Sequence, residues 1–319
     1  MRRLGVYLSS LGGLMLLCWP SATLAWGCKG HQTVALIAEK HLTPEAKQLV
    51  EKLLADNPID PKLNRYCGGA SRDRMADAST WADDVRAERK NGPWHYLDIP
   101  RGSKRGPLEQ YCGPHGCVTR AIGEQLAILK DLKADGAKRA EALRYLIHFV
   151  GDLHQPLHTT TNADEGGNCV PVKYFRRSAQ EHHHSYSPNL HSLWDTAIPE
   201  RDAEGADPAE YAETLDAQFA ADFEGWQKAG MHVEEWVWEG YDLAESVVYQ
   251  ALSPKIAVEP NVPVYSCADN NNIGERLLHQ NITAGQAYQE KAAPVVEKRI
   301  AEGGVRLAMI LNEALRAPE

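Results

Sequence analysis

Histidine and aspartate residues recur four positions apart in two apolar stretches of the chain. His148 and Asp152 lie in ALRYLIHFVGDLHQPLH (142–158), and His191 and Asp195 lie in NLHSLWD (189–195). Residues four apart stack on one face of a helix. A buried face that carries a histidine and a carboxylate needs something to satisfy them, for which a metal ion is a good candidate. One such pair alone favours a core or solvated His–Asp pair, but two copies in one chain favour a metal site.

Further histidines and aspartates along the chain could complete such a site. Zinc binds histidine nitrogen and carboxylate oxygen, four ligands at a time, and catalytic sites leave one position for water or substrate. Pro156 is expected to stop or kink the helix and to leave His158 just beyond its end. The consecutive histidines His182 to His184 lie in a polar stretch and are expected to be exposed. Eight candidate ligands are too many for one ion and suit a cluster in which Asp152 bridges two metals: His31, Asp83, His95, His148, Asp152, His158, His191 and Asp195.

The first 25 residues have the composition of a secretory signal peptide. A basic start is followed by an apolar run, and Thr23-Leu24-Ala25 has the small-x-small form of a cleavage site, so the mature chain is expected to begin at Trp26. No later run is long and apolar enough to cross a bilayer. The sequence therefore predicts a soluble exported protein, in the periplasm or the medium, without a membrane partner.

The mature chain is acidic. Removal of Arg2 and Arg3 with the signal peptide takes the formal net charge from −9 to −11. Binding to phosphate backbones depends on counterion release by Lys and Arg, so the composition argues against a generic nucleic-acid binder. Bound zinc would supply the local positive charge that a phosphate substrate requires.

The cysteine count indicates disulfides. Of seven cysteines, Cys18 leaves with the signal peptide, and an even number in an exported protein is typical of disulfide bonding. Cys112 and Cys117 flank a short, turn-rich loop and are the expected pair, although a zinc-binding knuckle is an alternative. The pairing of the other four stays open among three possibilities: Cys28, Cys67, Cys169 and Cys267.

Hydrophobic periodicity predicts a single, mainly α-helical domain over residues 26–319. Thr43 is the expected cap of one helix, with Pro44 at its first position, and Pro294 is expected to kink or split another. Helices are expected over 31–42, 44–55, 73–90, 118–134, 137–153, 208–229, 233–252, 275–300 and 305–315, with 94–100 extended, 170–175 a short strand and 253–273 a loop.

An ordered set of motifs resembles the S1/P1 nuclease family, the zinc-dependent single-strand nucleases and 3′-nucleotidases of fungi, plants and bacteria. Any one tetrapeptide would be weak, but the set is specific and covers essentially all of the mature chain. The resemblance implies an all-helical fold of the zinc phospholipase C and single-strand nuclease type, with a short β-hairpin near the active site. The matching segments are WGCKGH (26–31), TWAD (80–83), HYLD (95–98), HFVGD (148–152), QPLH (155–158), GGN (166–168), NLHSLWDT (189–196) and GGVRLA (303–308).

The resemblance also implies three zinc ions. Zinc ions in such sites activate a water for attack on phosphorus and stabilise the departing oxygen. The alternative role for Trp26 is that of an ordinary N-terminal anchor. By analogy, one zinc takes Asp83, His95, His148 and Asp152, a second takes His158, His191 and Asp195, and a third takes Asp152, His31 and the free amino group and carbonyl oxygen of Trp26.

Arg86 is the expected phosphate-binding cation. It lies one helical turn beyond Asp83 and could reach a phosphate oxygen as charge builds in the transition state. The alternative is a helix salt bridge with Asp83 or Asp84. Together with Asp83 and Asp152, Arg86 forms the catalytic set that the resemblance implies.

Tyr96 and Asp98 are the expected base-binding residues. An aromatic wall stacks on bases without reading sequence, and Asp98 could hydrogen-bond a base edge, although both side chains could instead serve core packing. The chain departs from the fungal pattern between His158 and Gly166, where it is one residue longer and places Glu165 where an apolar residue is expected. The base preference therefore stays open.

The implied substrates are single-stranded DNA and RNA and 3′-nucleotides, cut to 5′-phosphorylated products by a monomer with no stable protein partner. A zinc phospholipase C-like phosphoesterase is the first alternative, because those enzymes resemble this family in fold and ligands. A non-catalytic periplasmic zinc-binding protein is the second, because such proteins usually expose a His-rich tract.

Overall fold

The computed structural model of the chain describes residues 26–63, 67–68, 71, 73–262, 264, 266–268 and 273–316. The predicted signal peptide, residues 1–25, lies outside the described residues. Its cleavage before Trp26 therefore stays a prediction.

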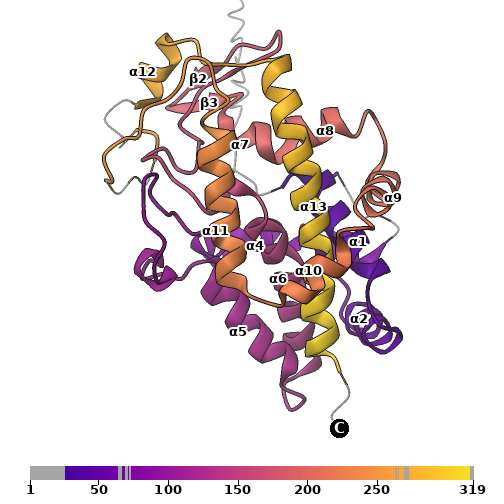
Figure 1. Ribbon diagram of the computed structural model, residues 1–319. Coiled ribbons are helices and arrows are strands. Elements are labelled where there is room, and N and C mark those ends of the chain that lie inside the picture. Colours follow the sequence, from indigo (N-terminus) through magenta and orange to yellow (C-terminus); the bar gives the residue numbers. More distant parts are fainter. Residues whose placement is uncertain are drawn as a thin grey trace, which may run out of the picture.

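The described chain is mostly helical, which confirms the predicted fold class (Figure 1). Short 3₁₀ turns span Gly92–His95, Leu108–Tyr111 and Pro156–His158, and π-helical turns span Leu193–Ala197 and Ala244–Val248. The α-helices are α1 (Cys28–Lys40), α2 (Pro44–Asp56), α3 (Arg74–Ala78), α4 (Trp81–Arg89), α5 (Val118–Lys130), α6 (Gly136–Leu153), α7 (Leu190–Ser192), α8 (Ile198–Asp202), α9 (Pro208–Gln218), α10 (Phe223–Ala229), α11 (Val233–Leu243), α12 (Ile273–His279) and α13 (Gln286–Ala314).

Helix α6 is the buried centre of the fold. The Asp135 side chain caps it by accepting a hydrogen bond from the Ala137 amide, and every residue from Ala142 to Leu153 is buried. It packs against α5 along its length and also contacts α1, α2, α4 and α13. A helix that is apolar on all sides is stable only inside such a bundle, so its one histidine and one aspartate near the C-terminal end are carried into the core.

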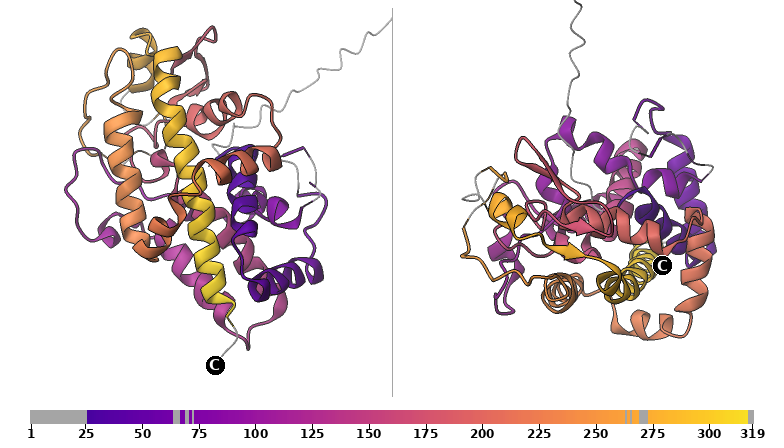
Figure 2. Two further views of the ribbon diagram at one scale, coloured as in Figure 1. Left: turned by 45° about the vertical axis from the view of Figure 1, so that its right-hand side comes forward. Right: turned by 90° about the horizontal axis from the view of Figure 1, so that it is seen from above.

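Helix α13 runs the length of the molecule (Figures 1 and 2). The prediction of two helices, 275–300 and 305–315, was wrong: the break falls between His279 and Gln286, and α13 continues unbroken through Pro294. The reason lies in its packing on α1. A Cβ on Gly304 would lie 2.5 Å from a methyl carbon of Ile37, so the glycine permits close helix contact rather than ending the helix.

The predicted helix 73–90 is divided in two by Ser79 and Thr80, which separate α3 from α4. This break leaves the Ser79 carbonyl available to accept a hydrogen bond from His148 Nδ1 at 2.6 Å. The range 208–229 likewise forms two helices, α9 and α10, and 233–252 is α-helical only to Leu243.

The strands are few and short. β2 (Gln180–His182) pairs antiparallel with β3 (Ser185–Ser187), which confirms the expected hairpin, and β1 (Lys173–Tyr174) pairs parallel with β4 (Thr283–Ala284). The predicted strand 170–175 thus reduces to two residues. The predicted extended segment 94–100 begins inside a 3₁₀ turn and is extended only after His95.

Three disulfides link the described cysteines. The expected Cys112–Cys117 bond is present, which excludes a zinc knuckle there. The other two bonds, Cys28–Cys67 and Cys169–Cys267, resolve the pairing that the sequence left open. Within the described residues, no helix is both long and apolar enough to span a membrane.

Candidate metal centre

Asp152 lies among three histidines that come from different parts of the chain. Its Oδ2 atom is 3.1 Å from His95 Nδ1 and 3.2 Å from His148 Nε2, and its Oδ1 atom is 3.3 Å from His31 Nε2. All four side chains are at most 1 % exposed. One oxygen of this carboxylate thus faces His31 and the other faces His95 and His148, an arrangement that would suit a bridging metal ligand.

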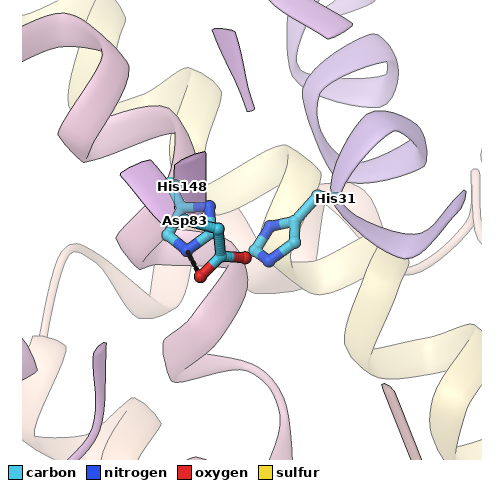
Figure 3. A group of neighbouring side chains, drawn as sticks. All are labelled: His31, Asp83 and His148. Carbon is cyan, nitrogen blue, oxygen red and sulfur yellow. Dashed lines mark ion pairs between the residues drawn. The ribbon is translucent and has the colours of Figure 1, made fainter. Parts of the chain in front are cut away.

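Asp83 closes this group from α4. Its Oδ1 atom is 3.6 Å from His95 Nδ1 and 3.8 Å from His148 Nε2. The rings of His31 and His148 stack with centroids 4.1 Å apart, and Figure 3 shows the Asp83 carboxylate next to both rings. The sequence prediction that α1, α4, α6 and the segment after α4 contribute to one site is thus consistent with the geometry.

The second group consists of His158, His191 and Asp195. One ligand atom from each lies within 4.8 Å of the others. His191 Nε2 is 3.2 Å from Asp195 Oδ2. The Asn189 side chain caps the turn that carries His191 by accepting a hydrogen bond from the Ser192 amide.

Backbone carbonyls fix the orientation of the histidine rings. His148 Nδ1 donates to Ser79 O, His158 Nδ1 donates to His95 O at 2.7 Å, and His191 Nδ1 donates to Gly166 O at 2.6 Å. In each ring a proton is thereby held on Nδ1, and Nε2 is turned toward the centre. This arrangement is typical of metal-binding histidines.

The residues present fit metal ions. Within the described part of the chain, a set of fully buried side-chain atoms makes no hydrogen bond, although unsatisfied buried polar atoms are costly. A bound cation would satisfy them. They include both oxygens of Asp152, Oδ1 of Asp83, both ring nitrogens of His31, and the Nε2 atoms of His95 and His158.

The charge states of the histidines also suit metal binding. Burial lowers the pKa of His31 to about 4, and burial lowers the pKa of His95 and His158, so these rings are neutral and offer lone pairs. Burial acts in the same direction on His148, but Asp152 and Asp83 outweigh it and raise its pKa to about 9. That ring holds a proton which a metal ion would displace.

Trp26 lies beside the second group. Its side chain is fully buried, and the amide of the next residue, Gly27, donates to the Asp195 carbonyl at 2.7 Å. A Cβ on Gly30 would lie 2.8 Å from the Trp26 Cβ. The start of the described chain is therefore packed against the predicted ligands, and its role as a ligand stays a prediction.

A cleft opens onto the centre in two parts. The smaller cavity, about 320 Å³, is lined by Tyr96, Asp98 and Glu165 together with the predicted ligands His158 and His191. The larger, about 610 Å³, is lined by Asp83, Lys90, Asp195 and residues of the β2–β3 hairpin. Arg86 lines both, and its Nη1 atom is 4.0 Å from Asp83 Oδ1. That position suits both roles considered for Arg86.

The structure brings together every predicted ligand side chain but leaves other histidines out. His182 to His184 lie exposed on the hairpin. His154, four residues before His158, uses both ring nitrogens elsewhere, because Nδ1 donates to Val150 O and Nε2 accepts from Arg306.

Sequence reasoning missed Gln155. Its side chain is fully buried, its Nε2 atom donates to Asp195 Oδ1 at 2.7 Å, and its Oε1 atom accepts from the Leu157 amide at 2.6 Å. Gln155 thus holds one oxygen of a predicted ligand. The available signal was a glutamine directly before Pro156 in an otherwise apolar stretch.

A buried group of histidines and aspartates at the base of a cleft, on a helical scaffold, is the arrangement of a metal-dependent hydrolase. The S1/P1 nuclease family model matches residues 26–316. The chain therefore belongs to the S1/P1 nuclease family, whose members hydrolyse phosphodiester bonds, and it is a nuclease.

Its relatives span nearly the whole chain. Nuclease S1 of Aspergillus oryzae is 29% identical over 91% of this chain and 92% of its own length. Nuclease P1 of Penicillium citrinum is 29% identical over 90% of this chain and 97% of its own length. Endonuclease 4 of Arabidopsis thaliana is 30% identical over 92% of this chain and 90% of its own length.

Proposed function

We propose that residues 26–319 form a single-domain, zinc-dependent enzyme that hydrolyses single-stranded DNA and RNA to 5′-phosphorylated products and removes phosphate from 3′-nucleotides. The observation that supports this most strongly is the position of Asp152, whose two oxygens face different histidine groups beside an open cleft.

Three zinc ions would be held by three sets of side chains. When bound, zinc in such a site lowers the pKa of an attacking water and neutralises charge on the departing oxygen. One ion would be held by Asp83, His95, His148 and Asp152. Another would be held by Asp152, His31 and the Trp26 terminus. His158, His191 and Asp195 form the remaining set, on the side of the cleft where the 3′-oxygen leaves.

The protein's own side chains would bind and orient the substrate. Arg86 lines both parts of the cleft, so its guanidinium can donate to a phosphate oxygen that lies between them. Tyr96 is 38% exposed and lines the smaller cavity, where its ring can stack on a base. Asp98, on the wall of the same cavity, can accept hydrogen bonds from a base edge.

Single-strand preference follows from the depth of the centre. The predicted ligands are almost fully buried, so the phosphate must enter the cleft and its base must leave the stack. A paired strand would have to lose stacking and pairing first. Export fits the three disulfides, which persist in oxidising compartments.

The test combines a metal count with product analysis. The purified mature protein is expected to contain three zinc ions and to cut a single-stranded oligonucleotide faster than its duplex, leaving 5′-phosphates. Products with 3′-phosphates would place the leaving group on the other side and contradict the roles given to the ligand sets. Turnover of phosphatidylcholine in place of oligonucleotide would favour the phospholipase alternative, and a zinc-loaded protein without either activity would favour a zinc-binding protein.

A further inference from the structure

The smaller cavity carries two carboxylates rather than one. Asp98 and Glu165 both line it, beside the exposed ring of Tyr96. We infer that Glu165, acting with Asp98, makes this cavity select a base that presents adjacent hydrogen-bond donors, guanine above all, over uracil and thymine. This inference rests on the proposed function and specifies the substrate class of the same site.

A constrained loop holds Glu165 in place. Glu165 has a φ of +52°, and Gly166 and Gly167 follow with φ of +58° and +87°. Asp164, fully buried, pins the loop because its carboxylate accepts hydrogen bonds from the Asn162 and Gly167 amides and from the Tyr249 hydroxyl. The backbone at Glu165 is therefore held in a defined conformation, in which Glu165 lines the cavity.

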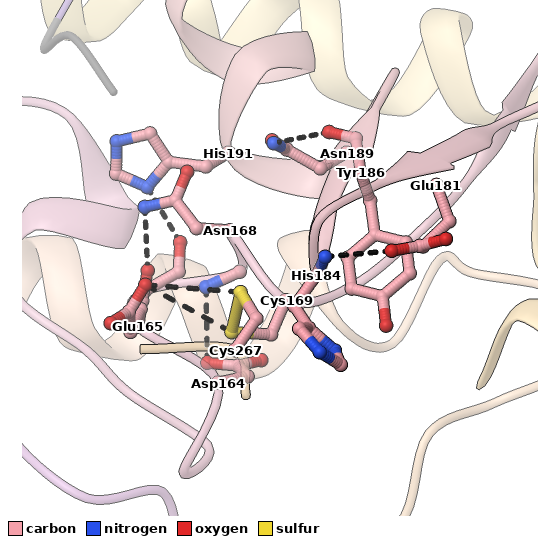
Figure 4. The surroundings of a disulfide bond; sticks show 12 residues. Asp164, Glu165, Asn168, Cys169, Glu181, His184, Tyr186, Asn189, His191 and Cys267 are labelled. Carbon is pink, nitrogen blue, oxygen red and sulfur yellow. Dashed lines mark hydrogen bonds between the residues drawn. A yellow bond between two sulfur atoms is a disulfide. The ribbon is translucent and has the colours of Figure 1, made fainter. Parts of the chain in front are cut away.

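The Cys169–Cys267 disulfide lies against the Glu165 carboxylate. Its Oε2 atom lies 4.0 Å from Cys169 Sγ and 3.8 Å from Cys267 Sγ, and Figure 4 shows the carboxylate beside the bond between the two sulfurs. Because both sulfurs are in the disulfide, neither is a thiolate that could hold a metal ion with Glu165. The Asn168 side chain donates to the Glu165 carbonyl at 2.8 Å and fixes the other end of the residue.

The side chains of Asp98, Glu165 and Tyr96 line the same cavity and influence one another electrostatically. The negative charges of Asp164 and Glu165 add to the effect of burial in raising the pKa of Asp98 to about 7. Burial raises the pKa of Tyr96, and the charges of Asp98 and Glu165 add to that rise. A base that stacks on Tyr96 would present its edge to the two carboxyl groups of Asp98 and Glu165, which line the same cavity.

Base chemistry determines which edge fits that wall. An ionised carboxylate only accepts hydrogen bonds. The Watson–Crick edge of guanine offers two adjacent donors, N1–H and the N2 amino group, which a carboxylate can accept together. Uracil and thymine offer one N–H between two carbonyl oxygens, and these oxygens would face the carboxylates unfavourably. Adenine and cytosine each offer one amino group and fall between.

The base in question belongs to the departing nucleoside. His158 and His191, which the proposed function places on the side of the departing 3′-oxygen, line the same cavity as Glu165. A 3′-nucleotide is therefore the smallest substrate that reports on this cavity. Its phosphate would lie toward Arg86 and its base toward Tyr96.

The test compares 3′-nucleotides on the zinc-loaded enzyme. We expect kcat/KM for 3′-GMP to exceed that for 3′-UMP about tenfold or more, in the range of one good bidentate contact. Glu165→Gln keeps the size but adds a donor that the uracil carbonyls can use, and Glu165→Leu supplies an apolar side chain. Each is expected to lower the ratio at least about threefold, because 3′-GMP loses the acceptor for its two donors while 3′-UMP is hydrolysed as well as before or better.

A control variant and a binding measurement accompany this test. Glu224→Gln removes an exposed charge that pairs with Lys228 and should leave the ratio unchanged. Calorimetry with guanosine and uridine measures the affinity of the cavity for each base independently of hydrolysis. A guanine-to-uracil ratio that is the same in wild type, Glu165→Gln and Glu165→Leu overturns the inference. A protein that hydrolyses no 3′-nucleotide refutes the proposed function instead, and nucleoside binding then still decides whether the cavity selects guanine.

Discussion

Asp152 Oδ1 and His31 Nε2 lie 3.3 Å apart in a fully buried contact between α6 and α1. The other oxygen of Asp152 faces His95 and His148, so the carboxylate contacts histidines from three segments of the chain. Because neither Asp152 oxygen makes a hydrogen bond to any described residue, the side chain is positioned for cations on both sides. Asp152 is therefore the residue whose loss should affect the largest part of the centre.

Asp152→Asn should remove about two of three zinc ions and lower hydrolysis at least about 100-fold, because loss of a direct ligand exceeds the usual effect of a supporting residue. His191→Ala should instead empty mainly the site of His158 and Asp195. Elemental analysis of both purified variants, with circular dichroism to verify folding, measures this difference. Full zinc and full activity in Asp152→Asn would show the ligand assignment to be wrong.

Gln155 should act through Asp195. Its amide holds Asp195 Oδ1, so Gln155→Leu removes that hydrogen bond and leaves the carboxylate free to rotate. Zinc affinity at the His158–His191–Asp195 set is expected to fall about 10- to 100-fold. Competition with a chelator measures the affinity independently of activity. Gln218→Leu, which removes an exposed hydrogen bond to Glu297, is the matched control, and equal zinc affinity in both variants would contradict this role.

The candidate ligands could be picked out from sequence because their chemistry is local, and their role as ligands stays a prediction. His148 with Asp152, and His191 with Asp195, follow from a four-residue spacing on apolar segments, and the fold then buries both pairs. The support around them could not be predicted in this way. The bond from Gln155 to Asp195 depends on how the turn after α6 meets the turn after α7.

Long-range packing explains the errors in the predicted helix boundaries. The continuity of α13 through Gly303 and Gly304 depends on contact with α1, from the opposite end of the chain. Helix propensity treats such glycines as breaks, whereas here they let two helices approach. The break between α3 and α4 at Ser79 also involves a long-range contact, because the Ser79 carbonyl accepts a hydrogen bond from His148 in α6.

Tyr96→Ala should weaken substrate binding more than it slows the chemical step. Stacking holds the base similarly in the ground and transition states, so its loss is expected to raise KM roughly 5- to 100-fold with little change in kcat. Tyr96→Phe keeps the ring and should behave as wild type. Steady-state kinetics on a 3′-nucleotide provide the check. An unchanged KM with sharply lower kcat would place Tyr96 in the support of its neighbour His95.

Asp98→Asn should stabilise the metal-free protein more at alkaline than at acid pH. Burial, with the charges of Asp164 and Glu165, raises the folded-state pKa of Asp98 to about 7. The folded state therefore holds a proton that the unfolded chain releases from about pH 4 upward, and the free energy of unfolding falls as pH rises through that window. Asparagine does not titrate, so its stabilising effect should be up to about 3 kcal/mol larger at pH 8 than at pH 5.

Urea unfolding in the presence of a chelator measures that difference. Asp242→Asn, at a side chain that is 58% exposed and paired with Arg105, is the control. A stabilisation by Asp98→Asn that is the same at both pH values would mean that Asp98 is ionised as readily in the folded protein as in the unfolded chain.

Cleavage directly before Trp26 should be required for activity as well as for export. A free α-amino group has a pKa of about 7.7–8.0, so a zinc ion can displace its proton near neutral pH. An amide nitrogen at the same position is a poor ligand, because resonance withdraws its lone pair into the peptide bond. The Trp26 side chain is buried, and the Gly27 amide donates to the Asp195 carbonyl, so the start of the described chain lies against a predicted zinc ligand.

The mature chain with Trp26 at its terminus should therefore bind one more zinc ion than a chain that retains even a single methionine before it. The extended form should lose at least about tenfold in nuclease activity, because its missing ligand serves the same ion as His31 and Asp152. Zinc analysis and oligonucleotide hydrolysis on both forms, with equal thermal stability as the folding control, measure the effect. Three zinc ions and equal activity in both forms would show that Trp26 anchors the terminus and that this metal ion takes its ligands elsewhere.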